Sequence, residues 1–325
     1  MRVGLRGGRL LINAACQITT VGMAGQDIEG RLVRYVASDG AVLHGMLVAP
    51  SGAKTCIIHV HGMTGNFYES GLGIALAKEA AARGIATFLA NTRGHDPVAL
   101  VDLQPSRGKG FILAGTDYER FEDCVLDIRA AMAAMHKYGF RRFVLSGHST
   151  GCQKVAYYQH RKKDAGVVAV LLFAPADDYN IHRKELGRRF GAIVALCRRM
   201  VKGRRGKMTA SGIPSSFCAR RFLSVADLAC PEARLFNYDG SMKEFASIRV
   251  PIFAAFGSEE RHALKPVATY LDILRVKSGS RAFHSGVVGG AGHSFEGHEG
   301  QAAGAALDWL GKGAAVNGLG GRGAN

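Results

Sequence analysis

Apolar and polar residues along this chain form blocks whose period switches repeatedly between that of a strand and that of a helix. Short uninterrupted apolar runs are typical of strands that are buried on both faces of a sheet. Such runs occupy residues 55–60, 86–90, 142–145 and 167–173. Helical spacing occurs between and after them at residues 68–82, 118–138 and 150–161. Strands that alternate with helices predict a mostly parallel, doubly wound sheet with helices on both faces.

The remaining segments extend this prediction in both directions. Residues 31–49 alternate on either side of Asp39-Gly40, which predicts a β-hairpin. Residues 91–115 are polar and predict a loop. The alternation of strands and helices stops after Pro175 and resumes at residue 250. The elements expected there are a strand at 250–256, a helix near 266–277, a strand near 283–288 and a helix at 301–310.

These patterns predict one α/β domain with an insertion after its sixth or seventh strand. The core is expected to comprise residues 31–178 and 246–313. Residues 179–245 contain no clear buried strand and many basic residues, so they predict a basic cap inserted into the core. Residues 1–30 are expected to form an N-terminal extension, ordered or disordered, and residues 314–325 a flexible Gly-rich tail.

Composition and charge exclude several classes of protein. The 325 residues are 47% hydrophobic and 21% charged, which excludes a disordered chain. No apolar run reaches about 18 residues, so we expect no membrane-spanning helix. The net charge is +16, but residues 183–221 contain 12 basic residues opposed only by Glu185, so this segment alone contributes +11. The rest of the chain is close to balanced, and we therefore expect no nucleic-acid partner.

The basic residues of the insertion lie around an apolar stripe. The stripe has helical spacing and comprises Phe190, Ile193, Val194, Cys197 and Val201. The other faces of this predicted helix carry Arg188, Arg189, Arg198, Arg199, Lys202 and Arg205. Three interpretations remain open. The basic residues form the solvated outer face of a packed helix, contact an anionic membrane surface, or contact an acidic group of a substrate.

The 7 cysteines are scattered along the chain, and no two of them have the C-x-x-C spacing. This arrangement supports neither a disulfide framework nor a zinc site. We expect buried reduced thiols, no metal and a cytoplasmic protein. Export is the alternative, because Cys16 follows Ala14 and Ala15 as in a lipoprotein cleavage site, although Asn13 stands where an aliphatic residue is required.

Residues 147–151 have the pattern G-x-S-x-G and lie between a predicted strand and a predicted helix. A sharp turn from strand to helix needs glycines on both sides of the serine, because Cβ atoms there would collide. The turn lifts the serine hydroxyl above the sheet edge. It also directs the next backbone N–H, that of Thr150, at the reacting oxygen. Ser149 is therefore the candidate nucleophile.

A serine hydroxyl is a weak nucleophile at neutral pH and needs a base, which in turn needs an orienting acid. His293 lies between the last predicted strand and the last predicted helix, where the base is expected, and His298 is its competitor. The acid is expected after the strand that ends at Phe256, where Glu259 and Glu260 occur. The order along the chain is then serine, acid, histidine.

With these motifs the chain resembles serine hydrolases of the α/β-hydrolase fold, in particular the monoglyceride-lipase-like and serine-aminopeptidase-like branch. The resemblance covers about residues 31–313 and includes His61-Gly62 and Arg93-Gly94-His95, which follow the third and fourth predicted strands. In such families the loop after His-Gly donates the second N–H of the oxyanion hole. The resemblance therefore implies that the N–H of Met63 pairs with that of Thr150.

The resemblance also implies an acid. The family usually has an aspartate at the position of Glu260, so this chain departs from the pattern there. Some relatives place the acid after the preceding strand, where Asp177 and Asp178 stand. Glu260 is the leading candidate, and Asp177, Asp178 and Glu259 remain alternatives.

The resulting hypothesis is a hydrolase that cleaves a small-molecule carboxylic ester through an acyl-enzyme, without a cofactor. An acyltransferase, thioesterase, peptidase or C–C hydrolase would use the same residues and stays an alternative. A serine rather than an aspartate at the turn argues against dehalogenases and epoxide hydrolases. An alternative of another class is a non-catalytic protein that binds a membrane or nucleic acid through its basic cap. Neither the substrate nor the oligomeric state follows from the sequence.

Overall fold

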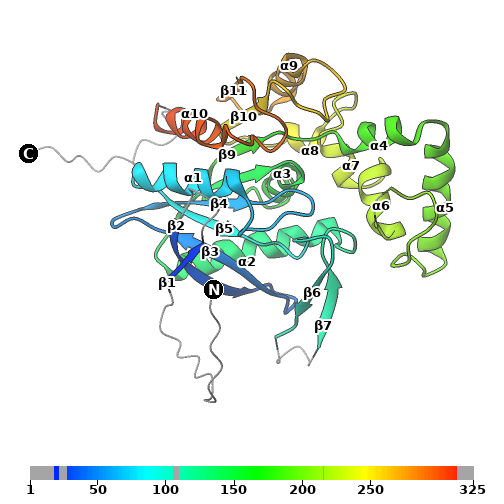
Figure 1. Cartoon of the computed structure of the whole chain (residues 1–325), viewed down its shortest axis with the longest axis horizontal. Helices are drawn as coiled ribbons and strands as arrows, with labels where there is room; N and C mark the ends of the chain where they lie inside the picture. Colours follow the sequence, from blue (N-terminus) through cyan, green and yellow to red (C-terminus); the bar gives the residue numbers. More distant parts are fainter. Residues whose placement is uncertain (1–17, 22–27, 105–109, 215, 313–325) are drawn as a thin grey trace, which may run out of the picture.

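The computed structural model describes residues 18–21, 28–104, 110–214 and 216–312. Within these residues, nine strands form a central sheet in the order β1-β2-β3-β5-β4-β8-β9-β10-β11 (Figure 1). Their bounds are β1 (Ile18–Val21), β2 (Ile28–Val36), β3 (Val42–Val48), β4 (Thr55–Val60), β5 (Ala86–Ala90), β8 (Arg142–His148), β9 (Val167–Phe173), β10 (Ile252–Gly257) and β11 (Phe283–Val288). The strands β1, β2 and β3 pair antiparallel with their neighbours, whereas β5, β4, β8, β9, β10 and β11 run parallel. The sheet is therefore mostly parallel, as the sequence predicts.

Helices cover both faces of this sheet. On one face α1 (Gly71–Ala82) packs beside α10 (Glu299–Lys312), and on the other α2 (Cys124–Lys137) packs beside α3 (Thr150–Lys162) (Figure 1). The helix α9 (Val267–Lys277) packs against β10 and β11. Every side chain of β4 and β5 is buried. Strands covered on both faces need apolar residues at consecutive positions, which explains the uninterrupted runs in the sequence.

The segment 91–115, expected to be a loop, contains a second, two-stranded sheet. Its strands are β6 (Ala99–Asp102) and β7 (Phe111–Ala114), which pair antiparallel. Leu100 and Phe111 are both exposed on this ribbon. Four-residue strands with exposed apolar side chains give too short a pattern to be separated from a loop.

The sheet also begins earlier than the sequence predicts. β2 starts at Ile28 rather than at residue 31, and β1 pairs antiparallel with it inside the expected N-terminal extension. Pairing of this kind depends on a partner strand and not on local composition. Residues 1–17, with the candidate cleavage site at Cys16, and the expected tail at 314–325 lie outside the described residues.

The insertion between β9 and β10 consists of helices joined by loops, with no strand in its described part, and it forms a second layer beside the sheet (Figure 1). Its elements are α4 (Asp178–Leu186), η3 (Gly187–Arg189), α5 (Phe190–Lys202), α6 (Ala219–Ala226), α7 (Pro231–Leu235) and α8 (Lys243–Ala246). It follows β9, the seventh strand of the central sheet in chain order. Apolar residues of α4, α5 and α6 form a core of their own, which includes Ile193, Cys197 and Phe222. We refer to residues 179–245 as the cap.

A buried ion pair joins the cap to the rest of the molecule. The guanidinium of Arg221, on α6, is fully buried and donates to Glu232 Oε1 over 2.9 Å. Its Nε donates to the carbonyl oxygen of Thr116 over 2.8 Å, and Glu119 lies 3.6 Å away. Glu232 belongs to the cap itself, so the contacts with Thr116 and Glu119 are the ones that link the cap to the rest of the molecule.

The state of the cysteines and the length of the helices bear on two further expectations from composition. Six cysteines lie in the described residues, all of them free, and five of these are buried. None of the helices that the structure describes is long and apolar enough to cross a membrane.

Candidate active site

The turn between β8 and α3 holds Ser149 in a strained conformation. Its backbone angles are φ 51° and ψ −123°, a region that residues with a Cβ rarely occupy. The flanking glycines are required by close backbone contacts. A Cβ on Gly147 would lie 2.4 Å from the carbonyl carbon of Gly151, and a Cβ on Gly151 would lie 2.2 Å from the carbonyl oxygen of Val60. The G-x-S-x-G pattern is therefore what lets the serine stand at this turn.

Three side chains from separate loops meet at this turn. The Oγ of Ser149 lies 2.9 Å from Nε2 of His293, in the loop between β11 and α10. The Nδ1 of the same imidazole lies 2.7 Å from Oε2 of Glu260, in the loop after β10. All three residues are at least nine-tenths buried. This is the arrangement of a nucleophile, a base and an orienting acid.

The surroundings of Glu260 favour its charged form. Burial raises the pKa of this carboxyl, but the hydrogen bond with His293 and the charge of that ring outweigh burial, so the net pKa is lowered. Its second oxygen, Oε1, accepts the backbone N–H of His262 over 2.9 Å. An ionised Glu260 draws the proton of His293 to Nδ1 and leaves Nε2 free to accept one from Ser149.

The other candidate acids have different contacts. Asp177 caps α4: its Oδ1 accepts the N–H of Asn180 over 3.1 Å. Asp178 accepts a hydrogen bond from Nε2 of Gln153 over 2.8 Å. Glu259 is exposed. Among the four carboxyl groups considered from the sequence, Glu260 is the one that contacts the His293 ring.

The competing histidine, His298, lies away from these contacts. Its Nδ1 is 3.2 Å from the carbonyl oxygen of Glu296. His148, which precedes Ser149, lies closer: its Nε2 is 2.9 Å from the carbonyl oxygen of His293. Burial and the neighbouring His293 lower the pKa of His148 to about 4, so it is neutral at physiological pH. A neutral ring with its proton on Nε2 donates to that carbonyl and fixes the backbone of His293.

The loop after β4 approaches the serine closely. A Cβ on Gly62 would lie 3.0 Å from the Cβ of Ser149, so this loop passes directly beside the serine. Met63 is the next residue of the loop. The backbone N–H of Met63 donates to no described residue. Thr150 is the first residue of α3, and the first N–H groups of a helix have no partner within it. Both amides are thus available to an oxygen beside Ser149.

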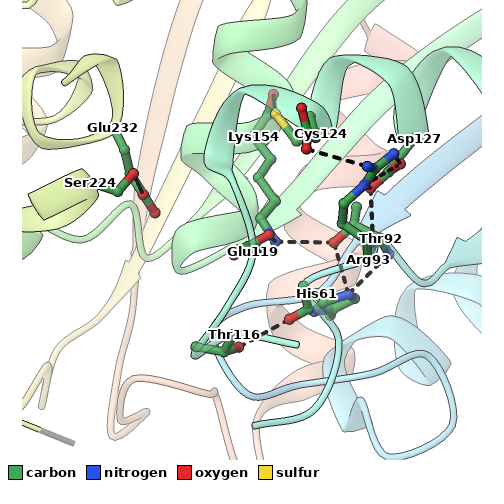
Figure 2. Close-up of polar contacts among 12 residues, drawn as sticks. His61, Thr92, Arg93, Thr116, Glu119, Cys124, Asp127, Lys154, Ser224 and Glu232 are labelled. Atoms are coloured by element: carbon green, nitrogen blue, oxygen red, sulfur yellow. Dashed lines mark hydrogen bonds and ion pairs between the residues drawn. The ribbon is translucent and has the colours of Figure 1, made fainter. Parts of the chain in front are cut away.

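A buried polar network contacts this loop (Figure 2). Nε2 of His61 accepts the N–H of Thr92 over 3.2 Å, and Oγ1 of Thr92 accepts from Nζ of Lys154 over 3.0 Å. Lys154 lies on α3 and forms an ion pair of 2.9 Å with Glu119. The network connects the β4 loop to the helix that follows Ser149.

Sequence reasoning missed Lys154 and Glu119. The one signal in the sequence is Gly94, which belongs to the Arg93-Gly94-His95 motif of the resemblance and had been assigned no role. A Cβ on Gly94 would lie 2.0 Å from Oε2 of Glu119, so the glycine makes room for this carboxylate.

A cavity of about 410 Å³ opens above Ser149. It is lined by the β4 loop with Met63, by Thr150, by His293 and by the first cap helix, α4. None of the 12 basic residues in 183–221 lines it. In the described part of the chain, no group of three or more His, Cys, Asp or Glu residues is arranged to hold a metal ion.

Solved structures with this fold are numerous. A carboxylesterase from Bacillus subtilis is 16% identical and aligns over 88% of this chain and 93% of its own, with a TM-score of 0.52. Est1E from Butyrivibrio proteoclasticus is 16% identical over 86% and 98%, with a TM-score of 0.55. A monoacylglycerol lipase from Paleococcus ferrophilus is 17% identical over 82% and 98%, with a TM-score of 0.54.

Comparisons of sequence give fewer matches than comparisons of structure. A search of curated proteins gives no significant match. Residues 107–312, which are more than half of the chain, match the family described as "Protein of unknown function (DUF1749)". The chain therefore belongs to the DUF1749 family, and it has the α/β-hydrolase fold.

Proposed function

We propose that this protein is a serine hydrolase that cleaves a carboxylic ester through an acyl-enzyme. The observation that carries the proposal is the continuous line of hydrogen-bond distances from Ser149 Oγ to His293 and on to Glu260. The cavity above the serine supports it, because a substrate carbonyl needs access to Oγ. The choice of an ester rests on the fold relatives, which include a carboxylesterase and a monoacylglycerol lipase.

Acylation follows from the positions of these atoms. Nε2 of His293 takes the hydroxyl proton while Oγ of Ser149 bonds to the ester carbonyl carbon. The negative charge that develops on the carbonyl oxygen is held by the N–H groups of Met63 and Thr150. The imidazolium, stabilised by Glu260, then gives its proton to the alcohol oxygen as the C–O bond breaks.

Deacylation repeats the sequence with water as the nucleophile. His293 takes a proton from water while the water oxygen bonds to the acyl carbon. The tetrahedral intermediate collapses, the proton returns to Ser149 Oγ, and the carboxylic acid leaves. If an alcohol, amine or thiol replaces water at this step, the same residues perform acyl transfer. Thioesters, amides and activated C–C bonds would be cleaved by the same steps.

A fluorophosphonate probe tests the proposal directly, because it labels only an activated serine. We expect labelling of the natural protein, no labelling of Ser149→Ala, and full labelling of the control Ser211→Ala, whose hydroxyl is exposed on the cap. Product analysis with an ester in water alone, and then with an added alcohol, separates hydrolysis from acyl transfer. Labelling that persists in Ser149→Ala would refute the proposal.

We further propose that one edge of the cap, along α5 and the residues after it, contacts an anionic lipid surface. Arg199, Lys202, Arg204 and Arg205 are exposed there, and none of them has an ion-pair partner among the described residues. Arg198 differs, because it pairs with Asp227 over 2.7 Å. The exposed side chains of Val201 and Met208 lie among these cations. Cations mixed with apolar side chains suit a lipid headgroup region better than a nucleic acid.

A further inference from the structure

One face of α4 forms a wall of the cavity above Ser149. Asp178, Ile181, His182 and Glu185 repeat at the spacing i, i+3, i+4 and i+7, which places them on one side of a helix. All four line the cavity. Three of them are ionisable, so the helix presents a polar, acidic face to the substrate although the protein as a whole carries a charge of +16.

Asp178 is the most deeply placed of these groups. Its side chain is 9% exposed and accepts one hydrogen bond, from Nε2 of Gln153 over 2.8 Å, and it forms no ion pair within the described residues. Burial and the negative charge of Glu232 raise the pKa of this carboxyl to about 8. Without a ligand this carboxyl is therefore mostly protonated at neutral pH, and a positive partner that reaches it would lower its pKa and favour the carboxylate.

A polar atom in the same cavity lacks any hydrogen-bond partner among the described residues. The hydroxyl of Thr150 is buried, lines the cavity and has no hydrogen-bond partner among the described residues. Buried polar side chains in folded proteins are nearly always hydrogen-bonded. An orphaned hydroxyl beside the nucleophile therefore indicates a ligand atom that supplies the missing bond.

The rest of this cavity wall also carries a carboxylate, that of Glu185. Oε2 of Glu185 lies 3.1 Å from Nδ1 of His182, and the Glu185 side chain is half exposed at the rim. Among the described residues that line the cavity, Arg261 is the single arginine or lysine. Its Nε lies 3.1 Å from Nε2 of His262, so it is not paired with the carboxylates of α4.

We propose that this face of α4, with Asp178 and Glu185, is a subsite for a protonated amine carried by the ester substrate. The inference rests on the proposed function and names its substrate class. An ammonium group has three N–H donors and a positive charge. It can give one hydrogen bond to Asp178 and another to Thr150 Oγ1 while its charge balances that of the carboxylates. A purely hydrocarbon chain would leave the Thr150 hydroxyl without a hydrogen-bond partner and Asp178 without a positive one.

The test compares 4-nitrophenyl esters of straight-chain ω-amino acids with the matching alkanoates, over a series of chain lengths. We expect the kcat/KM of the best amino ester to exceed that of its neutral partner by about tenfold to a hundredfold, the range of one or two charge-assisted hydrogen bonds. Asp178→Asn keeps an oxygen for Gln153 but removes the charge, and it should lower this preference about tenfold. Glu185→Gln should lower it by a smaller factor, because Glu185 is more exposed.

A matched control removes a carboxylate elsewhere. Asp272→Asn, on the exposed face of α9, should leave the preference unchanged. If the natural protein shows no preference at any chain length, or if both α4 variants keep it, the subsite is overturned while the esterase proposal stands. Calorimetric binding of ω-amino amides and alkyl amides to Ser149→Ala gives a readout that does not need turnover. Equal binding of the two amides would also overturn the subsite, whether or not the esters are hydrolysed.

Discussion

Glu260 Oε2 lies 2.7 Å from Nδ1 of His293, a contact between two loops that are 33 residues apart in the chain. The loops follow β10 and β11, which are neighbours in the parallel sheet. Their carboxyl ends therefore meet at one edge. A glutamate side chain thus reaches the imidazole from the position at which the family resemblance leads us to expect an aspartate.

The contact between Glu260 and His293 predicts how activity changes when the carboxylate charge is removed. Glu260→Gln should lower kcat by about 10⁴-fold, because the imidazole loses the group that fixes its tautomer and stabilises its protonated form. Asp177→Asn and Asp178→Asn should each cost far less on a neutral ester. Steady-state kinetics of the three variants on one neutral ester provide the comparison, and a reversed ranking would move the acid to the loop after β9.

The nucleophile is tested by its own variant. Ser149→Ala should lower kcat by about 10⁶-fold, the scale of a complete triad loss, while the thermal midpoint stays close to that of the natural protein. The fold should survive, because the Ser149 hydroxyl makes no described hydrogen bond except that with His293. Substantial activity in a stable Ser149→Ala protein would contradict the triad.

Activity should rise with pH around neutrality. A histidine base must be neutral, and free histidine titrates near ~6.5, so kcat/KM should rise between about pH 6 and 8 and then level off. Glu260 does not limit this rise, because its pKa is lowered and it is already ionised there. A profile of kcat/KM for a neutral ester with a maximum near pH 4 would exclude a histidine base.

Asp178 makes a prediction about stability rather than rate. Its pKa in the folded protein is about 8, whereas an unfolded aspartate has a pKa near ~3.9. Between these values the folded state holds a proton that the unfolded state has released, so the free energy of unfolding falls as pH rises. Asp178→Asn removes this titration and should gain stability over the natural protein as pH rises from about 5 to 8. Urea midpoints at several pH values measure the difference, and parallel curves would contradict it.

The basic cap edge predicts binding to charged vesicles. Replacement of Arg199, Lys202, Arg204 and Arg205 by glutamine should weaken sedimentation with phosphatidylserine-containing vesicles by about 10²-fold to 10³-fold, at ~1 kcal/mol for each cation near an anionic surface. Added salt should have the same effect, because exposed charges are screened over about 8 Å at physiological ionic strength. Vesicles of phosphatidylcholine alone should not bind.

A control for this experiment neutralises exposed cations elsewhere. Arg34, Lys54, Lys137 and Lys162 are exposed outside the cap, and their replacement by glutamine should leave vesicle binding largely intact. Equal loss in both quadruple variants would indicate a nonspecific effect of net charge. Binding to RNA or DNA that exceeds vesicle binding would assign the edge to a nucleic acid instead, and no binding to either would make it a solvated face.

The sequence by itself determined the features that depend on short stretches of chain. A strand covered on both faces must be apolar at consecutive positions, so β4, β5 and β9 could be read at their observed bounds. The serine turn could also be predicted from a short stretch, because a G-x-S-x-G pattern between a strand and a helix is typical of a sharp turn that exposes the serine. The hairpin at 99–114 was missed, because its two strands are too short and too exposed to give a period.

The tertiary structure alone decided which distant groups meet. Four carboxyl groups fitted the sequence as partners of His293, and only the packing of loops at the sheet edge brings Glu260 Oε2 to its ring. The ion pair of Lys154 with Glu119 and the cavity-facing side of α4 depend in the same way on contacts between segments far apart in the chain. Such contacts are set by the relative positions of elements, which a local pattern of residues does not encode.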